Sequence, residues 1–463
     1  MYPKTEINCI QVISYKSIPS SKSSKYKNLE VETIFDLKPK YADQSPSSLS
    51  LRASHYLPKL VNFPTRAVQL FGFLPYKLDQ NSGLHFSPKH APFSLLLAFL
   101  IFTVAWKILY YTVNIEEILY PVKNMTSNGP LRRSSTTEKL SEHLVTSVIL
   151  FSTTGIRILA LIEGNKVTKF YSKLTHALEN IRVVEGGHEN IEEFVRSSGT
   201  WITRGIMASA SMLFAPNLYF TILQYISICQ EQDDTSTMKR ILVGVGVTVK
   251  NVIGISESFY IFWMAALIQG IQLGFVVLEQ NFKGNSSKHE IKSEPEFEEH
   301  VENINNLKSV VENFGMVFSL QIILMMLSYS VIWAIDIFLV INKAVTAFGV
   351  GDLVLDGIVV AMALFMCNNS VILVLLAIVS QNLGEQAGRT IDLFGQYGFD
   401  KYSEELRGKL QGFFSVMSPT IVTHGFYICP GNYFSLNKRT VTSVFGFLTT
   451  YVFVLLQFQG TEK

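Results

Sequence analysis

Seven long apolar stretches divide this chain, and they constrain its fold more than any other feature. They cover about residues 92–113, 142–162, 203–228, 248–278, 317–341, 353–380 and 440–459. A helix of about 20 residues is roughly 30 Å long, which matches the hydrocarbon core of a bilayer. Because 48% of the residues are hydrophobic and only 16% are charged, the chain is typical of a polytopic membrane protein. The stretches therefore predict an all-α membrane protein with seven transmembrane helices.

Composition and spacing also exclude several classes of protein. The net charge of +2 gives no indication of a nucleic-acid partner. The four cysteines lie far apart, and no pair has the spacing of a disulfide framework or a metal site. No motif for a catalytic nucleophile, a metalloprotease or a phosphate-binding loop is present. We therefore expect neither an enzyme nor a bound cofactor or metal.

The polar segments between the stretches predict the domain organisation. Residues 1–90 are rich in Ser and Lys and lack an early apolar region, so we expect a cytoplasmic segment, largely disordered at its start, without a cleavable signal peptide. Val301, Ile304, Leu307, Val310, Val311 and Phe314 have helical spacing, and we expect an amphipathic helix there. Residues 402–424 have the same character, and we expect both to pack outside the membrane on one side. The expected parts are 1–90, helices one to six with a ligand-binding bundle (91–380), a cytoplasmic anchor region (381–438) and the last helix (439–463).

The distribution of Lys and Arg predicts the orientation. The N-terminal segment and the even-numbered connections carry many basic residues, and the odd-numbered loops carry few. Since basic loops stay in the cytoplasm, the N-terminus is expected inside and, with seven spans, the C-terminus outside. A sequon at Asn124, a candidate glycosylation site, falls in the first outside loop and agrees. A G-protein-coupled receptor has the opposite orientation, and its Asp-Arg-Tyr and Asn-Pro-x-x-Tyr motifs are absent here.

The last apolar stretch carries a polar stripe. Ser443, Thr450 and Gln457 recur every seven residues, which returns them to nearly the same face of a helix. Unpaired polar groups are costly in lipid, so this face must meet protein or water. Two interpretations remain open: contact with another helix through small hydroxyl residues, or the wall of a pore.

The same stretch resembles a family signature. Thr450-Tyr451, five apolar residues and Gln457-Phe458 resemble the end of the last helix in insect gustatory receptors, and the architecture is similar from about Leu60 onward. The resemblance implies seven helices, a cytoplasmic N-terminus, a plasma-membrane location, and a homotetrameric, ligand-gated, non-selective cation channel with the last helix lining a central pore. It also implies a small-molecule tastant, permeant cations and membrane lipid as partners, and leaves open hetero-oligomers with other gustatory receptors.

The resemblance implies roles for residues of the last helix. Gln457 and Phe458 take the positions of the outer pore constriction, and we group Ser443, Thr450 and Val454 with them as pore or gate residues. A ring of Phe side chains can close a pore by dewetting, and amides can replace part of an ion's hydration. Tyr451 is assigned to packing between pore helices. The alternative for Phe458 is an aromatic anchor at the membrane interface.

A ligand-binding region is expected where aromatic and polar side chains share helix faces. Tyr329, Trp333 and Asp336 are spaced by four and three residues, and Glu257, Tyr260 and Trp263 are spaced similarly. We expect both faces at comparable depth in the outer leaflet, where carboxylates inside a membrane are functional candidates. The alternative is that the aromatic residues mark the interface and the carboxylates are solvated.

Fructose or a related sugar is the first-ranked ligand. The general sugar-receptor branch has an acidic residue after Thr-Tyr, where this chain has Val452, whereas Phe434 to Arg439 and the Gln-Phe-Gln ending resemble the fructose-sensing branch. A bitter-tastant receptor is the next alternative. A non-binding accessory subunit remains open, as does a secondary transporter, although we detect no paired internal repeats.

Overall fold

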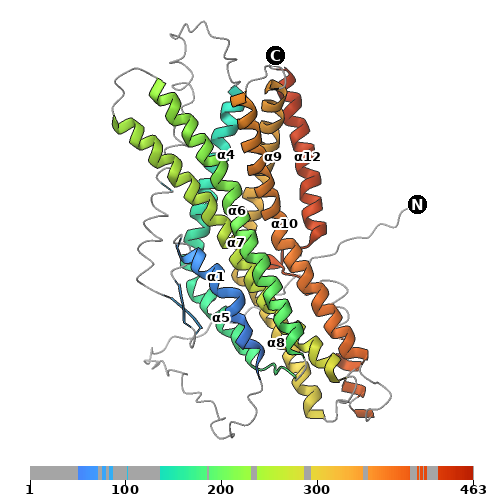
Figure 1. Ribbon diagram of the computed structural model, residues 1–463. Coiled ribbons are helices and arrows are strands. Elements are labelled where there is room, and N and C mark those ends of the chain that lie inside the picture. Colours follow the sequence, from blue (N-terminus) through green and yellow to red (C-terminus); the bar gives the residue numbers. More distant parts are fainter. Residues whose placement is uncertain are drawn as a thin grey trace, which may run out of the picture. The chain divides into compact units, whose positions relative to one another are not determined.

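The computed structural model is almost entirely helical (Figure 1). It describes residues 51–70, 76–79, 83–86, 102, 136–184, 187–230, 237–285, 294–347, 353–396, 404–405, 407–409, 411–413, 415 and 426–461. The elements are η1 (Ala53–Tyr56), α1 (Leu57–Leu70), β1 (Tyr76–Asp79), β2 (Gly83–Phe86), α4 (Thr136–Ile162), α5 (Gly164–Glu179), α6 (His188–Gln230), α7 (Thr237–Asn285), α8 (Glu294–Val317), α9 (Ser319–Ala347), α10 (Leu353–Gln396), η3 (Pro430–Asn432) and α12 (Lys438–Thr461). The two strands form one antiparallel hairpin. The predicted all-α class is confirmed.

Six of the seven apolar stretches lie in helices, namely α4, α6, α7, α9, α10 and α12. The first stretch, about 92–113, falls outside the described residues. Among those described, stretches of α7, α9 and α10 are each long and apolar enough to cross a membrane. The pair α4 and α5 would form a fourth span, bent by 67° at its break. The helix α5 was not predicted from the sequence, because its Lys residues indicated a loop.

Several helices continue well beyond their apolar stretches. The predicted span at 203–228 belongs to α6, which begins at His188, and the span at 353–380 belongs to α10, which ends at Gln396. In α7 every residue from Ser256 to Glu279 is buried by protein. A helix that is apolar on all sides is typical of a protein interior as much as of a membrane. Part of this run is therefore apolar because other helices enclose it.

The amphipathic helix predicted around residues 301–314 is confirmed as α8. Ile304, Leu307, Val310, Val311 and Phe314 are buried, while the opposite face is exposed. Phe318 separates α8 from α9, and backbone hydrogen bonds from Phe318 to Phe314 and from Ile322 to Phe318 cross this junction. The segment predicted at 402–424 is described only in short pieces, in which Phe413 packs against Phe394 of α10 at 5.8 Å between ring centroids.

The core lies where α1, α5, α7 and α8 meet. Phe170 of α5 packs edge to face against Phe314 and Phe318, with centroid distances of 5.5 and 5.8 Å. Close approach requires small residues on α7: a Cβ at Gly270 would lie 2.7 Å from Leu57, and one at Gly274 would lie 2.6 Å from Leu307. These glycines thus allow α7 to approach α1 and α8 closely.

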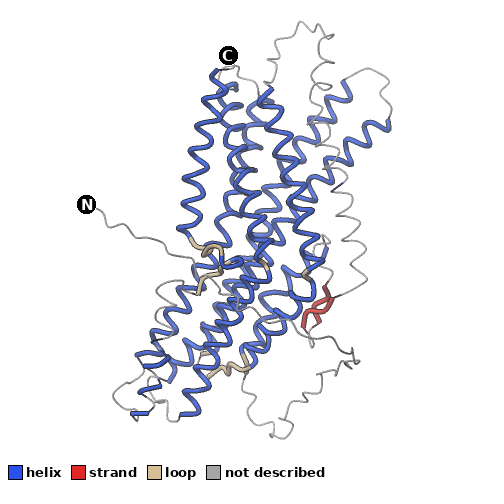
Figure 2. The backbone as a smooth tube through the Cα atoms, turned by 180° about the vertical axis from the view of Figure 1, so that it is seen from behind, coloured by secondary structure: helices blue, strands red, loops and turns tan. Residues whose placement is uncertain are grey.

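A compact loop connects this core to the last helix. Residues 426–437 precede α12 and appear in tan in Figure 2. Gly431 and Asn432 have positive φ angles of 56° and 62°, which form the tight turn of η3. The Ile428 amide donates to Ser380 Oγ of α10, and the Lys438 amide donates to Gln381 Oε1. The start of α12 is therefore tied to α10. All described residues belong to one unit, Ser50–Lys463.

Candidate functional site

The helix α12 has one packed face and one exposed face. Val441, Leu448 and Val452 are buried, and the last two form a small cluster with Ala334 of α9. Ser443, Thr450 and Gln457 all lie on the exposed side, together with Val454 and Tyr451. The side chain of Phe458 falls outside those described. The helix lies at the edge of the described bundle (Figure 1), and the predicted stripe is on its exposed face.

The hydroxyl groups of this stripe are satisfied within their own helix. Ser443 Oγ donates to the Arg439 carbonyl at 3.0 Å, and Thr450 Oγ1 donates to the Gly446 carbonyl at 3.2 Å. In such a bond the hydroxyl hydrogen is donated to the helix backbone, and the hydroxyl oxygen can still accept a hydrogen bond from water or another chain. Contact with another helix of the same chain does not explain the stripe within the described residues. A second copy of the chain, a water-filled path or a part of the chain outside the described residues remains to cover it.

Trp333 connects three helices. Its indole Nε1–H donates to Ser370 Oγ of α10 at 2.9 Å, and its ring meets Phe445 of α12 edge to face at a centroid distance of 4.7 Å. One turn further along α9, the Asp336 carboxylate accepts a hydrogen bond from Asn369 Nδ2 of α10 at 3.0 Å. A change at this α9–α10 contact is therefore positioned to reach α12 through a single side chain.

Glu257 belongs to a buried polar network between α4 and α7. Its carboxylate accepts hydrogen bonds from Ser152 Oγ at 3.2 Å and from Thr153 Oγ1 at 2.6 Å. The guanidinium of Arg157 interacts electrostatically with the Glu257 carboxylate. Arg157 Nη2 also donates a hydrogen bond to Ser256 Oγ at 2.8 Å. Tyr329 of α9 completes the network through Ser258.

Arg157 is buried, although an arginine at this place in a transmembrane helix is expected to reach water. We would place an arginine near the end of a transmembrane helix at the interface, with its head group extended to water. Instead its side chain is fully buried. The reason is local: Ser256 and Glu257 on the neighbouring helix supply an acceptor and a compensating charge, which make burial tolerable.

Tyr260 and Trp263 lie away from the contact between Trp333 and Asp336. Both are completely buried, with Tyr260 Oη donating to Gln321 Oε1 at 2.6 Å and Trp263 Nε1 donating to Thr65 of α1 at 3.1 Å. Gln321 precedes Trp333 by 12 residues on α9, a rise of about 18 Å.

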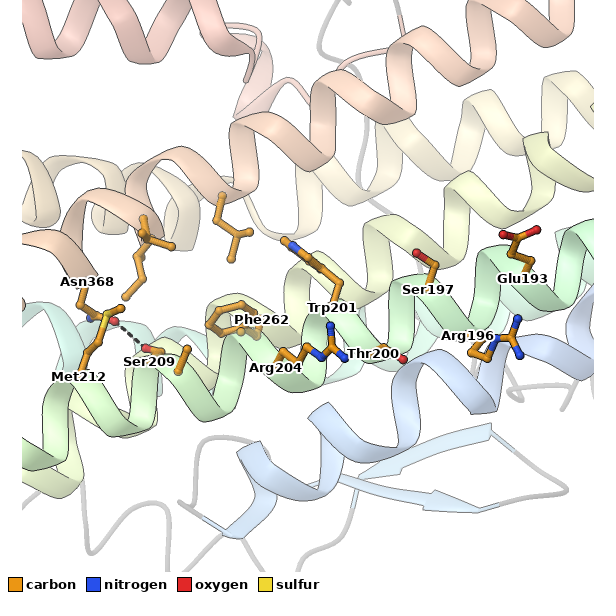
Figure 3. A pocket seen from close by; sticks show the side chains of 15 residues that line it. Glu193, Arg196, Ser197, Thr200, Trp201, Arg204, Ser209, Met212, Phe262 and Asn368 are labelled. Atoms are coloured by element: carbon orange, nitrogen blue, oxygen red, sulfur yellow. Dashed lines mark hydrogen bonds between the residues drawn. The ribbon is translucent and has the colours of Figure 1, made fainter.

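A cavity of about 720 Å³ lies between α6, α7 and α10 (Figure 3). Its polar end is lined from α6 by Glu193, Arg196, Thr200 and Arg204, and its apolar end by Phe262 of α7 and by α10. None of the six predicted ligand-binding residues lines this cavity or the adjoining one, which shares Arg196 and Arg204.

Sequence reasoning missed the amide pair of α10. Asn368 Oδ1 accepts a hydrogen bond from Ser209 of α6 at 2.7 Å, whereas Asn369 turns to Asp336 on the other side. Two adjacent amides within an apolar stretch are a signal that could have identified these residues, since polar groups in a membrane require partners. Arg157 carries the same kind of signal. The predicted sequon at Asn124 falls outside the described residues.

Comparisons with known proteins agree with this architecture. No curated protein matches the sequence significantly. The fold is similar to the insect olfactory receptor OR5 from Machilis hrabei, with a TM-score of 0.62 and 14% identity over 87% of this chain and 99% of that chain. The structure of that receptor in complex with eugenol gives a TM-score of 0.63 with the same identity and coverage.

A family model for 7tm chemosensory receptors matches residues 65–462. The match covers most of the chain and all of the transmembrane helices discussed above. The family consists of receptors in membranes and not of enzymes. The predicted membership of an insect chemosensory family is confirmed, and this chain belongs to the 7tm chemosensory receptor family.

Proposed function

We propose that this chain is the subunit of a homotetrameric, ligand-gated, non-selective cation channel in the plasma membrane. In this proposal α12 lines a central pore, the N-terminus is cytoplasmic and the C-terminus lies outside. The outward-facing stripe of Ser443, Thr450 and Gln457 is the observation that carries the proposal, because it is polar, exposed and as long as the helix. Four such faces around an axis would give a hydrated path through the bilayer.

The proposed ligand is a small tastant, with fructose or a related sugar ranked first. Support for the sugar comes from the resemblance of Phe434 to Arg439 and of the Gln-Phe-Gln ending to the fructose-sensing branch. Support for a small-molecule ligand comes from the structurally similar olfactory receptor that was solved with eugenol.

We propose the contact between α9 and α10 as part of the ligand-binding region. Asp336 and Asn369 present a carboxylate and an amide, which suit the hydroxyl groups of a sugar, and Trp333 supplies an aromatic face. Trp333 also contacts Phe445 of α12, so a ligand that repositions it would act directly on the pore helix. The difference in ligand affinity between the open and closed states must supply the gating energy. Glu257, Tyr329, Tyr260 and Trp263 then serve to hold the bundle.

Whole-cell current tests the channel proposal. Cells expressing this chain alone would be challenged with fructose, glucose, sucrose and a panel of bitter compounds, with cation substitution during any response. We expect a fructose-evoked, weakly selective cation current. A current evoked only by a bitter compound would make that compound, and not a sugar, the ligand. Absence of current despite confirmed surface protein would favour an accessory subunit. Stoichiometric uptake would favour a transporter.

Substitutions on α12 test the pore assignment. Gln457→Ala and Phe458→Ala should alter ion selectivity, resting current or block, while Thr442→Ala near the start of the helix serves as the control. Surface labelling must show equal expression of all variants. Unchanged permeation in both Gln457→Ala and Phe458→Ala would contradict a pore lined by α12.

A further inference from the structure

The cavity between α6, α7 and α10 extends from a part of α6 that carries charged residues to a part that carries none. Arg204 is followed by no charged residue on α6 from Gly205 to Gln230. The cavity continues past this boundary to Asn368 and Leu375, which lie in an uncharged part of α10. In a membrane protein such a boundary marks the interface between headgroups and hydrocarbon. The cavity thus leads from the headgroup region into the apolar layer.

The polar end of the cavity carries a net positive charge. Arg196, Thr200 and Arg204 are spaced by four residues and form one row along α6 (Figure 3). Neither arginine forms an ion pair with any residue that the structure describes. Glu193 is the one acidic residue in the lining of this cavity, so two positive charges face one negative charge there, while Lys59, Glu189 and Glu192 line an adjoining cavity that shares both arginines. Arginine and a hydroxyl group are well suited to bind phosphate oxygens.

The apolar end contains a hydrogen-bond donor without a partner. Asn368 is only 2% exposed, and its Nδ2 has no acceptor among the described residues, although its Oδ1 binds Ser209. Ser209 lies five residues after Arg204, a rise of about 7.5 Å along α6. An unsatisfied buried donor is costly, which indicates that an acceptor from outside the described residues fills this place.

The remaining walls are suited to hydrocarbon. Phe262, Ile372 and Leu375 line the cavity, and Gly205 leaves room for Phe262 because a Cβ at that position would overlap its ring. Val371 and Trp201 are exposed at 52% and 42%, so the cavity opens laterally on the surface of the described bundle. A chain from the bilayer can enter there without crossing any described helix.

We propose that this cavity binds one membrane phospholipid with an anionic headgroup. The phosphate lies between Arg196 and Arg204 with Thr200 as a further donor, an ester carbonyl accepts from Asn368 Nδ2, and an acyl chain packs against Phe262 and Ile372. The site is separate from α12 and from the contact between Trp333 and Asp336. It therefore does not depend on the channel proposal or on the identity of the tastant.

Lipid retention by the purified full-length protein tests this proposal. The protein would be reconstituted with an equimolar mixture of phosphatidylserine and phosphatidylcholine, extracted in mild detergent and analysed by native mass spectrometry. Arg196→Gln/Arg204→Gln removes the charges, and Ala208→Phe fills the apolar part without changing any charge. Arg66→Gln/Arg182→Gln is the matched control, since these arginines are exposed and do not line the cavity.

We expect the wild type and the control to retain phosphatidylserine in preference to phosphatidylcholine. The charge variant should retain about tenfold less, the loss expected for about 1.4 kcal/mol of phosphate contact. Ala208→Phe should lower retention as well, which separates a seated lipid from surface charge. Equal retention in all four proteins, or no preference for phosphatidylserine, would overturn the site. Displacement by inorganic phosphate alone would also overturn it, because it would show a phosphate site without a lipid.

Discussion

At the scale of single residues, two glycines in helices differ sharply in what surrounds them. Gly315 of α8 lies against the loop that leads to α12, and a Cβ there would lie 2.7 Å from the Cys429 carbonyl oxygen. Because backbone atoms cannot turn aside as a side-chain end can, either α8 or the loop must move. Gly388 of α10 has nothing within 4 Å of the equivalent Cβ position.

Gly315→Ala should therefore destabilise the protein by about 1–3 kcal/mol, as overpacking does. Gly388→Ala should be neutral or stabilising by up to about 1 kcal/mol, because alanine favours helix. The measurement is the temperature at which the detergent-solubilised protein loses its monodisperse elution peak. Equal midpoints for the two variants would contradict the close approach of Cys429 to α8.

His300 of α8 predicts a dependence of stability on pH. Its ring packs edge to face against Phe282 at a centroid distance of 5.0 Å, and burial lowers its pKa from the ordinary 6.5, while Glu296 and Glu299 oppose this shift. The folded protein thus binds fewer protons here than the unfolded chain, so this residue's contribution to stability falls as the pH drops through about 6.5.

The melting temperature of the wild type should decrease more steeply between pH 8 and pH 5.5 than that of His300→Asn. The variant keeps a small polar side chain without a titrating group, so any uniform loss of stability cancels when the slopes are compared. Parallel pH profiles would mean that His300 is not buried in solution.

At the scale of elements, the attachment of α12 decides how the proposed gate can move. This helix contacts α9 through Leu448 and Val452, and its other face is free within the described chain. Helix packing in a membrane gains little from the hydrophobic effect, since lipid tails are equally apolar. The contact is therefore suited to an element that has to shift during gating.

Cysteine pairs test this attachment. Ala334→Cys with Leu448→Cys should form a disulfide under mild oxidation, because these side chains pack together. Ala334→Cys with Phe447→Cys is the control, since Phe447 is 73% exposed and is turned about 100° away from Leu448. Both pairs require a background without the native cysteines, and peptide mass spectrometry identifies the link. Cross-linking of the control pair alone would place α12 in another rotation.

The sequence predicted the positions of the helices better than the contacts between them. Apolar stretches gave α4, α6, α7, α9, α10 and α12, because length and periodicity suffice to recognise a long helix. They could not show that Tyr260 and Trp263 pack beside α1, since a buried interior and a lipid environment select the same apolar residues. The stripe on α12 was recognisable because the alternation of polar and apolar residues is a property of one helix. The pairing of Asp336 with Asn369 was not, because it joins two helices and leaves no local pattern.

At the scale of the whole molecule, orientation is the property that most directly constrains the channel proposal. Basic residues concentrate in the N-terminal segment and in the even-numbered connections, which predicts a cytoplasmic N-terminus and an outside C-terminus. An epitope added after Lys463 should bind antibody on intact cells, and one added before Met1 should bind only after permeabilisation. The reverse result would contradict the proposed topology, together with the placement of Gln457 at the outer end of a pore.

The buried arginine of α4 has a consequence for how the protein is made. A lone charged side chain costs up to about 3 kcal/mol at the centre of a membrane helix on insertion scales, and less near the end, where Arg157 lies. Its hydrogen-bond partner Ser256 lies 99 residues further along the chain. At a synthesis rate of about 5–20 residues per second, α4 must wait about 5–20 s before that partner emerges from the ribosome. Newly made chains therefore pass through a period in which Arg157 depends on the insertion machinery, and quality control can act on this receptor before it is complete.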